Sequence, residues 1–145
     1  MKKILILNGP NLNLLHRRDK EIYGDVSLKK ISDDCLALAA ELEVEVELRQ
    51  SNSESELVNT IHEALDEFDG IIINAAAYTH TSVAIRDALE IYKKPKIELH
   101  ISNIFKREEF RHHSFLSDVV DAVISGLGAE GYTIALLAMN NLVRK

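Results

Sequence analysis

The chain has 145 residues, 46% of them hydrophobic, and a formal net charge of −6. This length suits one domain with a single core, and the hydrophobic fraction is that of a folded globular protein. The negative charge argues against nucleic acid or an anionic membrane as a partner, because both require clustered cations, whereas a few local arginines suffice to hold a small anionic ligand.

The sequence also bears on the cellular compartment. No apolar run approaches the length of a membrane span, and the four apolar residues after Lys2 and Lys3 are too few for the core of a signal peptide. The only cysteine, Cys35, lies among leucines and is expected to pack as a small hydrophobic side chain. A single cysteine forms no internal disulfide, which fits a reducing compartment. We therefore expect a cytoplasmic protein without membrane contact.

The first half of the chain begins with an apolar run at residues 4–7, bounded by Gly9 and Pro10, which predicts a buried parallel strand. Residues 8–27 are polar and show no apolar period, and loops of that length are usually lids or binding loops. Alternation over residues 44–49 predicts a second strand with one wet face, at an edge of the sheet. Between the polar stretch and this second strand we expect a helix whose inward face consists of Leu28, Ile31, Cys35, Leu38 and Leu42.

The second half continues the alternation of helices and strands. Ser53 and Glu56 have the spacing of a capping box, at the start of a helix that ends at Gly70. Thr81 and Ser82 are expected as N-cap residues of a later helix. The helix that these two residues cap is predicted at residues 81–92. The remaining elements are predicted as a third strand at residues 71–73, a fourth at 96–99, a fifth at 119–124 and a last helix at 129–143.

This alternation is typical of βαβ units around a parallel sheet. The predicted fold is α/β: a flavodoxin-like three-layer sandwich with a five-stranded parallel sheet in the order 2-1-3-4-5, formed by residues 1–145 as one domain, with a mobile lid at about residues 8–27. Ligands of such sheets bind at the carboxyl ends of the strands. The polar residues that follow the strands are therefore expected to line one pocket: Asn8, Asn11, Asn74, His80, His100 and Ser102.

One glycine motif points to a different function. Gly126, Gly128 and Gly131 match a dinucleotide-binding fingerprint, but no further strand pattern follows that would carry the ribose-binding acid. We interpret the motif as a tight turn between a strand and a helix, where glycine is needed for its backbone alone.

Metal and covalent chemistry are not favoured either. His62 with Glu63 lacks the second histidine of a metal-binding helix motif, and adjacent side chains such as His112 and His113 point apart on a helix. No lysine suggests a Schiff base, and no serine or cysteine lies in a nucleophile elbow. The sequence therefore predicts acid–base chemistry by tyrosine, histidine and arginine, with no metal.

Several sequence blocks occur in the order found in one known family. They are residues 9–15 (GPNLNLL) with Arg18, Tyr23 and Gly24, then residues 50–52, 56–58, 61–64, 77–82 (AYTHTS), 98–103 (ELHISN) and 107–114 (REEFRHHS). Over residues 4 to about 138 the chain thereby resembles the type II 3-dehydroquinate dehydratases. The resemblance implies a flavodoxin-like fold, a homododecamer of four trimers, no cofactor, and the dehydration of 3-dehydroquinate to 3-dehydroshikimate by anti elimination through an enolate. The reaction would serve the shikimate pathway or quinate breakdown.

The resemblance also implies roles for single residues. The reaction itself is assigned to Tyr23 as the base that removes the proton beside the ketone, Arg18 as the group that keeps it ionised, Asn74 as a stabiliser of the enolate, and His100 as the acid that protonates the departing hydroxyl. Substrate binding is assigned to Ile101 and Ser102 for the carboxylate, to His80 and Arg111 for ring hydroxyls, to Asn11 in the pocket, and to Asp87 from a neighbouring subunit.

Elementary chemistry is consistent with these roles. At neutral pH only about one free tyrosine in a thousand is ionised, and a guanidinium within roughly 4–6 Å favours the phenolate. Histidine titrates near neutrality, and Glu98, which strand alternation places on the same side as His100, would help to hold it protonated. The residues alone leave structural roles open: Asn74 as a turn residue, His100 as a buried structural histidine, and Arg111 as a surface cap.

Some positions depart from the family pattern. His16 stands where the family usually has glycine and Lys20 where it has proline, so lid closure is affected. Ala75 and Ala76 replace a proline and a glycine. Since alanine does not adopt a positive φ cheaply, either the pocket backbone is shifted or the turn does not need that conformation.

Two rival functions stay open on the sequence. One is a non-catalytic flavodoxin-like binding or signalling module. Against a phosphate-binding version, Pro10 removes a backbone amide that a phosphate loop would use. Against a phospho-receiver, Asn8 and Asn74 stand where acidic residues are needed. The other is an inactive homologue, which the departures suggest. An assay for dehydration of 3-dehydroquinate discriminates among the three.

Overall fold

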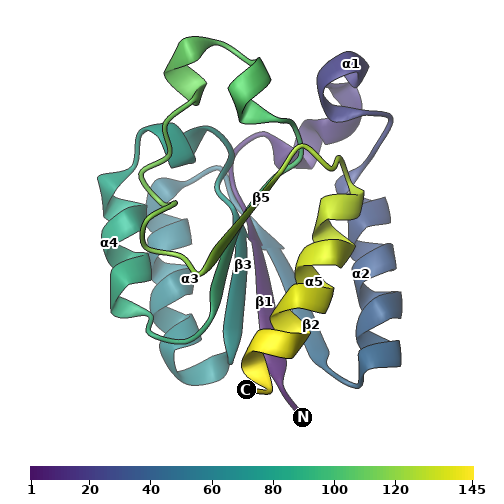
Figure 1. The fold of residues 1–145 in the computed structure, drawn as a ribbon, viewed down its shortest axis with the longest axis vertical. Helices are drawn as coiled ribbons and strands as arrows, with labels where there is room; N and C mark the ends of the chain where they lie inside the picture. Colours follow the sequence, from purple (N-terminus) through teal and green to yellow (C-terminus); the bar gives the residue numbers. More distant parts are fainter.

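The structure is a computed structural model that describes residues 1–145. Five parallel strands form one sheet in the order β2-β1-β3-β4-β5 (Figure 1). Their bounds are β1 (Lys3–Asn8), β2 (Glu45–Gln50), β3 (Gly70–Asn74), β4 (Lys96–His100) and β5 (Ala122–Ser125). The predicted flavodoxin-like sheet and its strand order are confirmed, and β2 lies at an edge as its one-sided pattern indicated.

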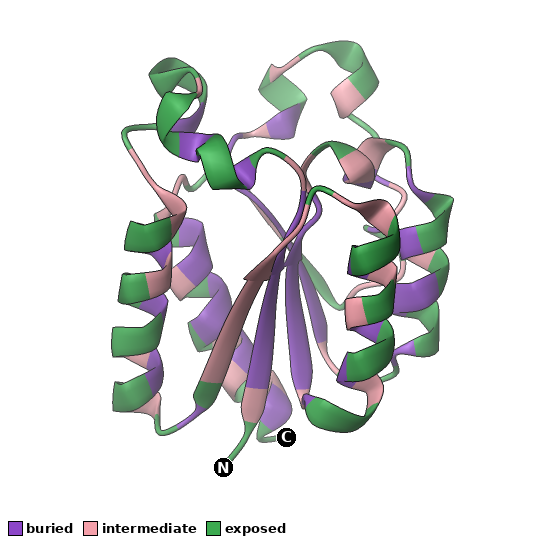
Figure 2. Cartoon of the chain, turned by 180° about the vertical axis from the view of Figure 1, so that it is seen from behind, coloured by how far each residue is buried: buried purple, intermediate pink, exposed green.

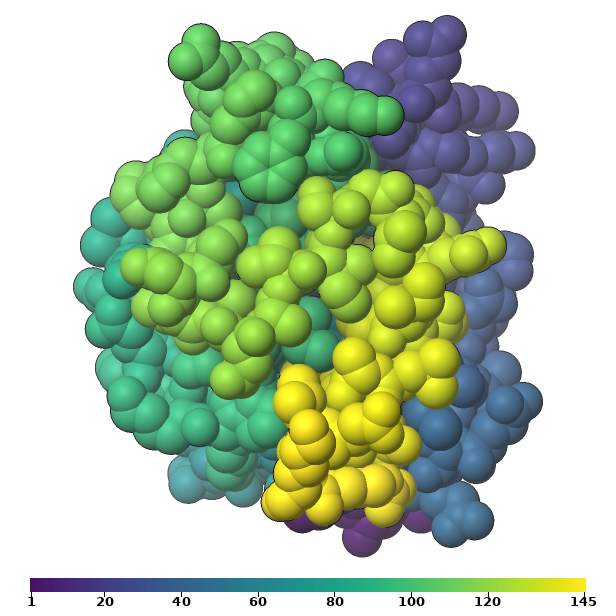
Figure 3. Space-filling view, in the orientation of Figure 1, coloured from purple at the N-terminus to yellow at the C-terminus, as the bar shows by residue number.

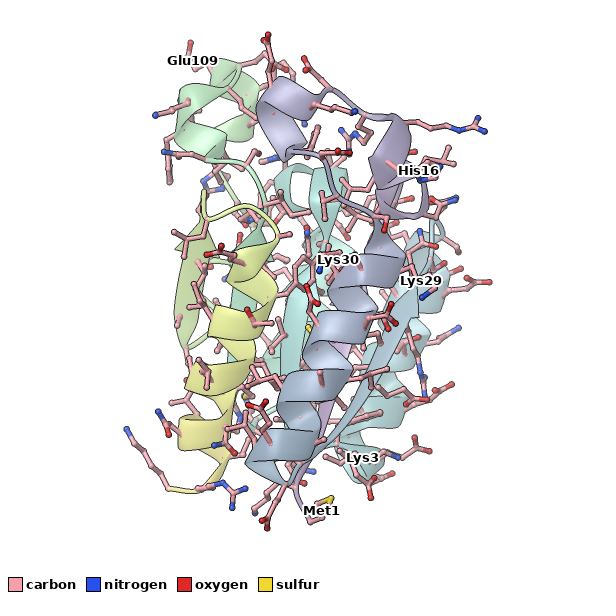
Figure 4. All side chains as sticks on the ribbon, turned by 90° about the vertical axis from the view of Figure 1, so that its right-hand side faces the viewer. Met1, Lys3, His16, Lys29, Lys30 and Glu109 are labelled. Carbon is pink, nitrogen blue, oxygen red and sulfur yellow. The ribbon has the colours of Figure 1, made fainter.

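Helices cover both faces of the sheet. Helices α2 (Leu28–Leu42) and α5 (Glu130–Val143) pack side by side on one face (Figure 4), and α3 (Glu54–Glu67) and α4 (Val83–Ile91) pack together on the other. Alternate residues of β1 enter the two cores: Ile4 joins the core under α2 and α5, whereas Leu5 joins the one under α3 and α4. The central strands β1, β3 and β4 are therefore buried (Figure 2), and each fully buried apolar side chain contributes roughly 1.5–3 kcal/mol.

Three helices begin at a serine whose hydroxyl accepts a backbone N–H. Ser27 caps α2, Ser53 caps α3 and Ser82 caps α4. The capping box predicted at α3 forms only by half, because the Glu56 carboxylate accepts from the hydroxyl of Ser51 instead of the Ser53 N–H. Of the two N-caps predicted for α4, Ser82 is confirmed and Thr81 is wrong.

The fifth strand starts later than its sequence pattern suggested. Its pairing with β4 begins at Asp121, whose N–H donates to the Lys96 carbonyl (2.9 Å) and whose carboxylate accepts the Lys96 N–H (2.8 Å). Val119 and Val120, predicted as strand residues, instead pack against the core under α3 and α4. The apolar character of that segment reflects burial ahead of the strand.

Two segments rise above the carboxyl ends of the strands (Figures 1 and 3). One contains the 3-10 helix η1 (Leu12–Arg17) and the short helix α1 (Lys20–Tyr23), so residues 8–27 are not structureless. The other contains η3 (Ile104–Lys106) and η4 (Glu109–Arg111), and a further turn, η2 (Ala76–His80), follows β3. Figure 4 labels His16 on the first segment and Glu109 on the second. None of the helices is long and apolar enough to span a bilayer.

Candidate active site

A pocket of about 600 Å³, counting the space at its mouth, lies where β1, β3 and β4 end beneath the two raised segments. Its polar lining consists of Asn11, Arg18, Tyr23, Asn74, His80, His100, Ser102, Arg107 and Arg111. The lining contains three arginines and no acidic residue, so the pocket favours an anion although the protein is negative overall.

Most of the site residues named from the sequence meet in this pocket. Ile101 belongs to its lining as well, whereas Asn8 and Asp87 do not. Asn8 was expected in the pocket but is buried behind it, because its side-chain oxygen accepts a hydrogen bond from the Tyr132 hydroxyl (2.6 Å). Asp87 is exposed on α4, outside the pocket of its own chain.

The phenol of Tyr23 lies between two guanidinium groups. Helix α1 is capped by Asp19 and ends at Gly24, which has a φ of 78°. The Tyr23 hydroxyl accepts hydrogen bonds from Nη2 of Arg18 and from Nη1 of Arg107, the latter at 2.8 Å. Both guanidinium carbons also lie over the ring, 4.0 and 5.3 Å from its centre. Two positively charged groups therefore meet at one phenol oxygen, an arrangement that stabilises negative charge developing there.

Arg107 is a site residue to which the sequence assigned no role. It stands in a run of charged residues, where arginine is usually solvated, and only its distance of four residues from Arg111 hinted at a shared surface. In the structure its Nη1 reaches both Tyr23 and, at 3.5 Å, the hydroxyl of Ser102. Its Nε is buried without a hydrogen-bond partner and lies 3.9 Å from the Glu108 carboxylate, while Nη1 faces the pocket side of Tyr23 and Ser102.

His100 and Glu98 form a buried pair at the end of β4. Nε2 of His100 contacts the Glu98 carboxylate, as alternation along the strand predicted. That carboxylate also accepts from the hydroxyls of Thr79 (3.2 Å) and Ser117 (2.7 Å). Burial alone would raise the pKa of Glu98. The hydrogen bond and the charge of His100, together with the hydrogen bonds of Ser117 and Ser114, lower this pKa on balance. Because an ionised carboxylate only accepts hydrogen bonds, Nε2 of His100 carries a proton toward Glu98. Nδ1 is the ring nitrogen that remains for reaction with a ligand.

His80 is held in its neutral form. Its Nδ1 lies 2.8 Å from the carbonyl of His113, and because a carbonyl only accepts, this nitrogen carries the proton. Burial lowers the pKa of His80, and the charges of His100 and Arg111 lower it further against the effect of that carbonyl. Nε2 is thus an acceptor, suited to a hydroxyl group of a ligand.

The turn after β3 keeps a left-handed conformation despite its alanines. Ala76 has a φ of 53°. Of the two alternatives considered for this turn, the one in which it does not need a positive φ is therefore wrong. The Ala76 N–H donates to the side-chain oxygen of Asn74 (3.2 Å), which stabilises the turn. Next to it, a side chain on Gly9 would collide with the Ala75 carbonyl oxygen, so only glycine fits there.

The glycine motif supports the site through the backbone. Gly126 and Gly128 have φ values of 92° and 66°, as expected of a tight turn. Their N–H groups donate to the carbonyls of His100 (3.3 Å) and Ile101 (3.0 Å). The turn therefore fixes the end of β4, where the Glu98–His100 pair and the start of the pocket wall lie. No three histidine, cysteine or acidic residues are grouped as metal ligands would be.

Comparison with known proteins gives consistent matches over the full fold. The family model described as Dehydroquinase class II matches residues 2–140. A 3-dehydroquinate dehydratase of Tolumonas auensis is 60% identical over 136 residues, which are 94% of this chain and 90% of that protein. One from Haemophilus influenzae is 54% identical over 99% of this chain and 97% of its own. The crystal structure of a type II dehydroquinase from Butyrivibrio crossotus superposes with a TM-score of 0.94 at 45% identity, covering 96% of this chain and 97% of that one.

Proposed function

This chain belongs to the class II dehydroquinase family, and from that premise we infer that it is a hydro-lyase that dehydrates 3-dehydroquinate to 3-dehydroshikimate. The reaction is a step of the shikimate pathway or of quinate catabolism. Family membership argues against a non-catalytic binding module. Arg18, Tyr23, Asn74 and His100 all line one pocket, which argues against a degenerate homologue.

The first step we assign to Tyr23. Its phenolate removes the proton from the carbon beside the ketone, and the electron pair of the broken C–H bond forms the enolate. Arg18 and Arg107 favour the charged form of the base through their contacts with its oxygen. The side-chain amide of Asn74, which faces the pocket, donates to the enolate oxygen as negative charge develops there.

The second step we assign to His100. When the ketone re-forms, the electron pair of the enolate makes the new carbon–carbon double bond and expels the hydroxyl group in the β position. Protonated His100 supplies the proton that turns this group into water, and the buried carboxylate of Glu98 stabilises the imidazolium before the transfer. The two steps together give an anti elimination without a cofactor.

Binding of the substrate follows from the charge of the pocket. We assign the substrate carboxylate to Ile101 and Ser102, where the guanidinium of Arg107, 3.5 Å from the Ser102 hydroxyl, adds positive charge. His80, through its acceptor nitrogen, and Arg111 hold ring hydroxyl groups, and Asn11 closes the pocket from the loop after β1. No lining residue repels the carboxylate.

Three further features belong to the proposal. Residues 8–27 form a lid over the site of this single domain, the chain assembles as a homododecamer of four trimers in which Asp87 completes a neighbour's site, and the enzyme works in the cytoplasm. In support, Asp87 is exposed on α4, where a neighbouring subunit can meet it.

The observation that carries the proposal is the Tyr23 hydroxyl held between two arginines in a pocket that also contains the Glu98–His100 pair. The test is to incubate the purified protein with 3-dehydroquinate and to follow the ultraviolet absorbance of the conjugated enone. We expect absorbance to appear with the wild-type protein and to be lost in Tyr23→Phe. Absence of product from the folded wild-type protein would contradict the proposed function.

A further inference from the structure

Tyr132 reaches the candidate active site from behind. It lies on α5, drawn in yellow in Figure 1, and is only 1% exposed. Its hydroxyl donates to the side-chain oxygen of Asn8 (2.6 Å) and accepts from the side-chain nitrogen of Asn74 (2.9 Å). Tyr132 does not line the pocket, so any effect on the reaction must pass through a residue that does.

The directions of these hydrogen bonds form a chain that begins at the backbone of β2. The carbonyl of Arg49 only accepts, so the NH₂ group of Asn8 faces it (3.4 Å) and the oxygen of that amide faces Tyr132. An amide oxygen also only accepts, so the O–H of Tyr132 is committed to Asn8. The hydroxyl oxygen of Tyr132 then has only lone pairs to offer to Asn74.

Asn74 is therefore held in one orientation from two sides. Its NH₂ group must face the lone pairs of Tyr132, and its oxygen must face the N–H of Ala76 (3.2 Å). The NH₂ group has two hydrogens, of which Tyr132 binds one, and the other remains for the pocket. A reversed amide would turn its oxygen toward a developing enolate and repel it.

We propose that Tyr132 is a positioning residue that orients the Asn74 amide so that a donor, not an acceptor, meets the enolate oxygen. This inference rests on the proposed function, because it concerns the enolate of that reaction. Orientation of a donor matters most where charge develops, so the effect belongs to the transition state and not to binding of the substrate.

The test compares Tyr132→Phe with Tyr92→Phe. Tyr92 is a matched control: it is also fully buried, and its hydroxyl donates to the Phe68 carbonyl (2.9 Å) at the opposite end of the sheet. We expect Tyr132→Phe to lower kcat about tenfold or more with little change in KM, since loss of a whole oxyanion donor costs about 10²–10³. Tyr92→Phe should leave both constants near wild type.

A double-variant cycle separates orientation from general loosening of the fold. In an Asn74→Ala background, Tyr132→Phe should cause no further loss of kcat, because the amide it orients is gone. A second variant, Asn8→Ala, leaves Tyr132 in place but frees its hydroxyl to donate to Asn74, and it should also lower kcat without raising KM. This variant decides the question if Tyr132→Phe does not fold.

The opposite results overturn the proposal. These are a normal kcat in folded Tyr132→Phe or Asn8→Ala, a loss equal to that in Tyr92→Phe, or a full additional loss in the Asn74→Ala background. An active wild-type enzyme with any of these results overturns the role of Tyr132 alone. A folded wild-type protein that forms no enone from 3-dehydroquinate overturns the proposed function and this inference together.

Discussion

At the scale of single residues, Ala76 stores backbone strain in the floor of the pocket. A non-glycine residue in the left-handed region costs about 1–2 kcal/mol of folding free energy. Glycine would remove that cost, but its greater freedom in the unfolded chain would destabilise the folded protein by up to about 1 kcal/mol. Since the φ of Ala76 is 53°, we expect Ala76→Gly to raise the free energy of unfolding by about 0.5–1 kcal/mol. Urea denaturation at a fixed protein concentration measures this change.

The neighbouring alanine provides the control for that prediction. Ala77 lies in η2 and is not among the residues with positive φ, so Ala77→Gly brings only the entropic cost and should lower the free energy of unfolding by about 0.5–1 kcal/mol. If both glycine variants destabilise the protein equally, the turn does not carry the strain assigned to it.

The buried carboxylate of Glu98 gives a prediction about pH. Its pKa in the folded protein lies below the ordinary 4.5, because the bonds and charge of His100 outweigh burial. A group with a lowered pKa contributes stability above its unfolded pKa and loses it as the pH falls through the folded value. Wild type should therefore unfold with a higher free energy than Glu98→Gln at pH 7, and the difference should shrink below about pH 4.5. A difference that is independent of pH would argue against an ionised Glu98.

At the scale of elements, the proposed lid, residues 8–27, is anchored at one end. Leu12 and Leu15 on η1 are buried in the core, whereas residues 19–22 are exposed and Gly24 offers a flexible hinge. We therefore expect opening to involve residues 18–25 and not the whole segment 8–27. Trypsin should cut the free protein first after Arg17, Arg18 or Lys20, and an excess of substrate and product should slow these cuts.

An exposed turn at the other end of the molecule serves as the reference for this experiment. Cleavage after Lys93, which is exposed between α4 and β4, should proceed at the same rate with and without ligand. Equal protection of Lys93 and the lid would mean that the ligand stabilises the whole fold instead of closing the lid.

The sequence predicted those elements whose pattern is local. The apolar run of β1 and the one-sided alternation of β2 needed no partner to be interpreted. The start of β5 depended on Asp121 pairing with Lys96, a contact across 25 residues, and therefore lay beyond local pattern. The loss of half the capping box at α3 has a local cause instead, since Ser51, five residues before Glu56, competes for its carboxylate.

At the scale of the whole molecule, the assembly can be tested through Asp87. If Asp87 completes a neighbour's site, Asp87→Ala and Tyr23→Phe should each be nearly inactive alone. Hybrids refolded from a mixture should regain activity, because an Asp87→Ala subunit keeps its own base and can receive Asp87 from a Tyr23→Phe neighbour.

The same hybrids have a clear control. Mixing Tyr23→Phe with Arg18→Ala should restore nothing, because both residues lie on the same lid of the same chain. Regain of activity in this control, or none in the Asp87 hybrid, would argue against a shared site. Sedimentation of the wild-type protein should show a dodecamer.

The candidate site shows how far chain order alone can lead. Apart from Asn8, the residues named next to strand ends do line the pocket, because parallel strands bring their carboxyl ends together. Arg107 and Tyr132 were missed because each acts through a contact with a residue far along the chain, at separations of 84 and 58 residues. Such contacts depend on the packing of the lid and of α5, which no local spacing reveals.

The most direct test of the account is the dependence of kcat on pH in two lid variants. Arg18→Ala removes one of the charges that favour the Tyr23 phenolate, so its rate at pH 7 should fall by about 10²-fold or more and recover as the pH rises toward 9–10, where hydroxide ionises the phenol. Tyr23→Phe has no group to ionise and should stay inactive throughout. Near-normal turnover by Tyr23→Phe, or an Arg18→Ala variant that gains nothing at high pH, would contradict a tyrosinate base activated by arginine.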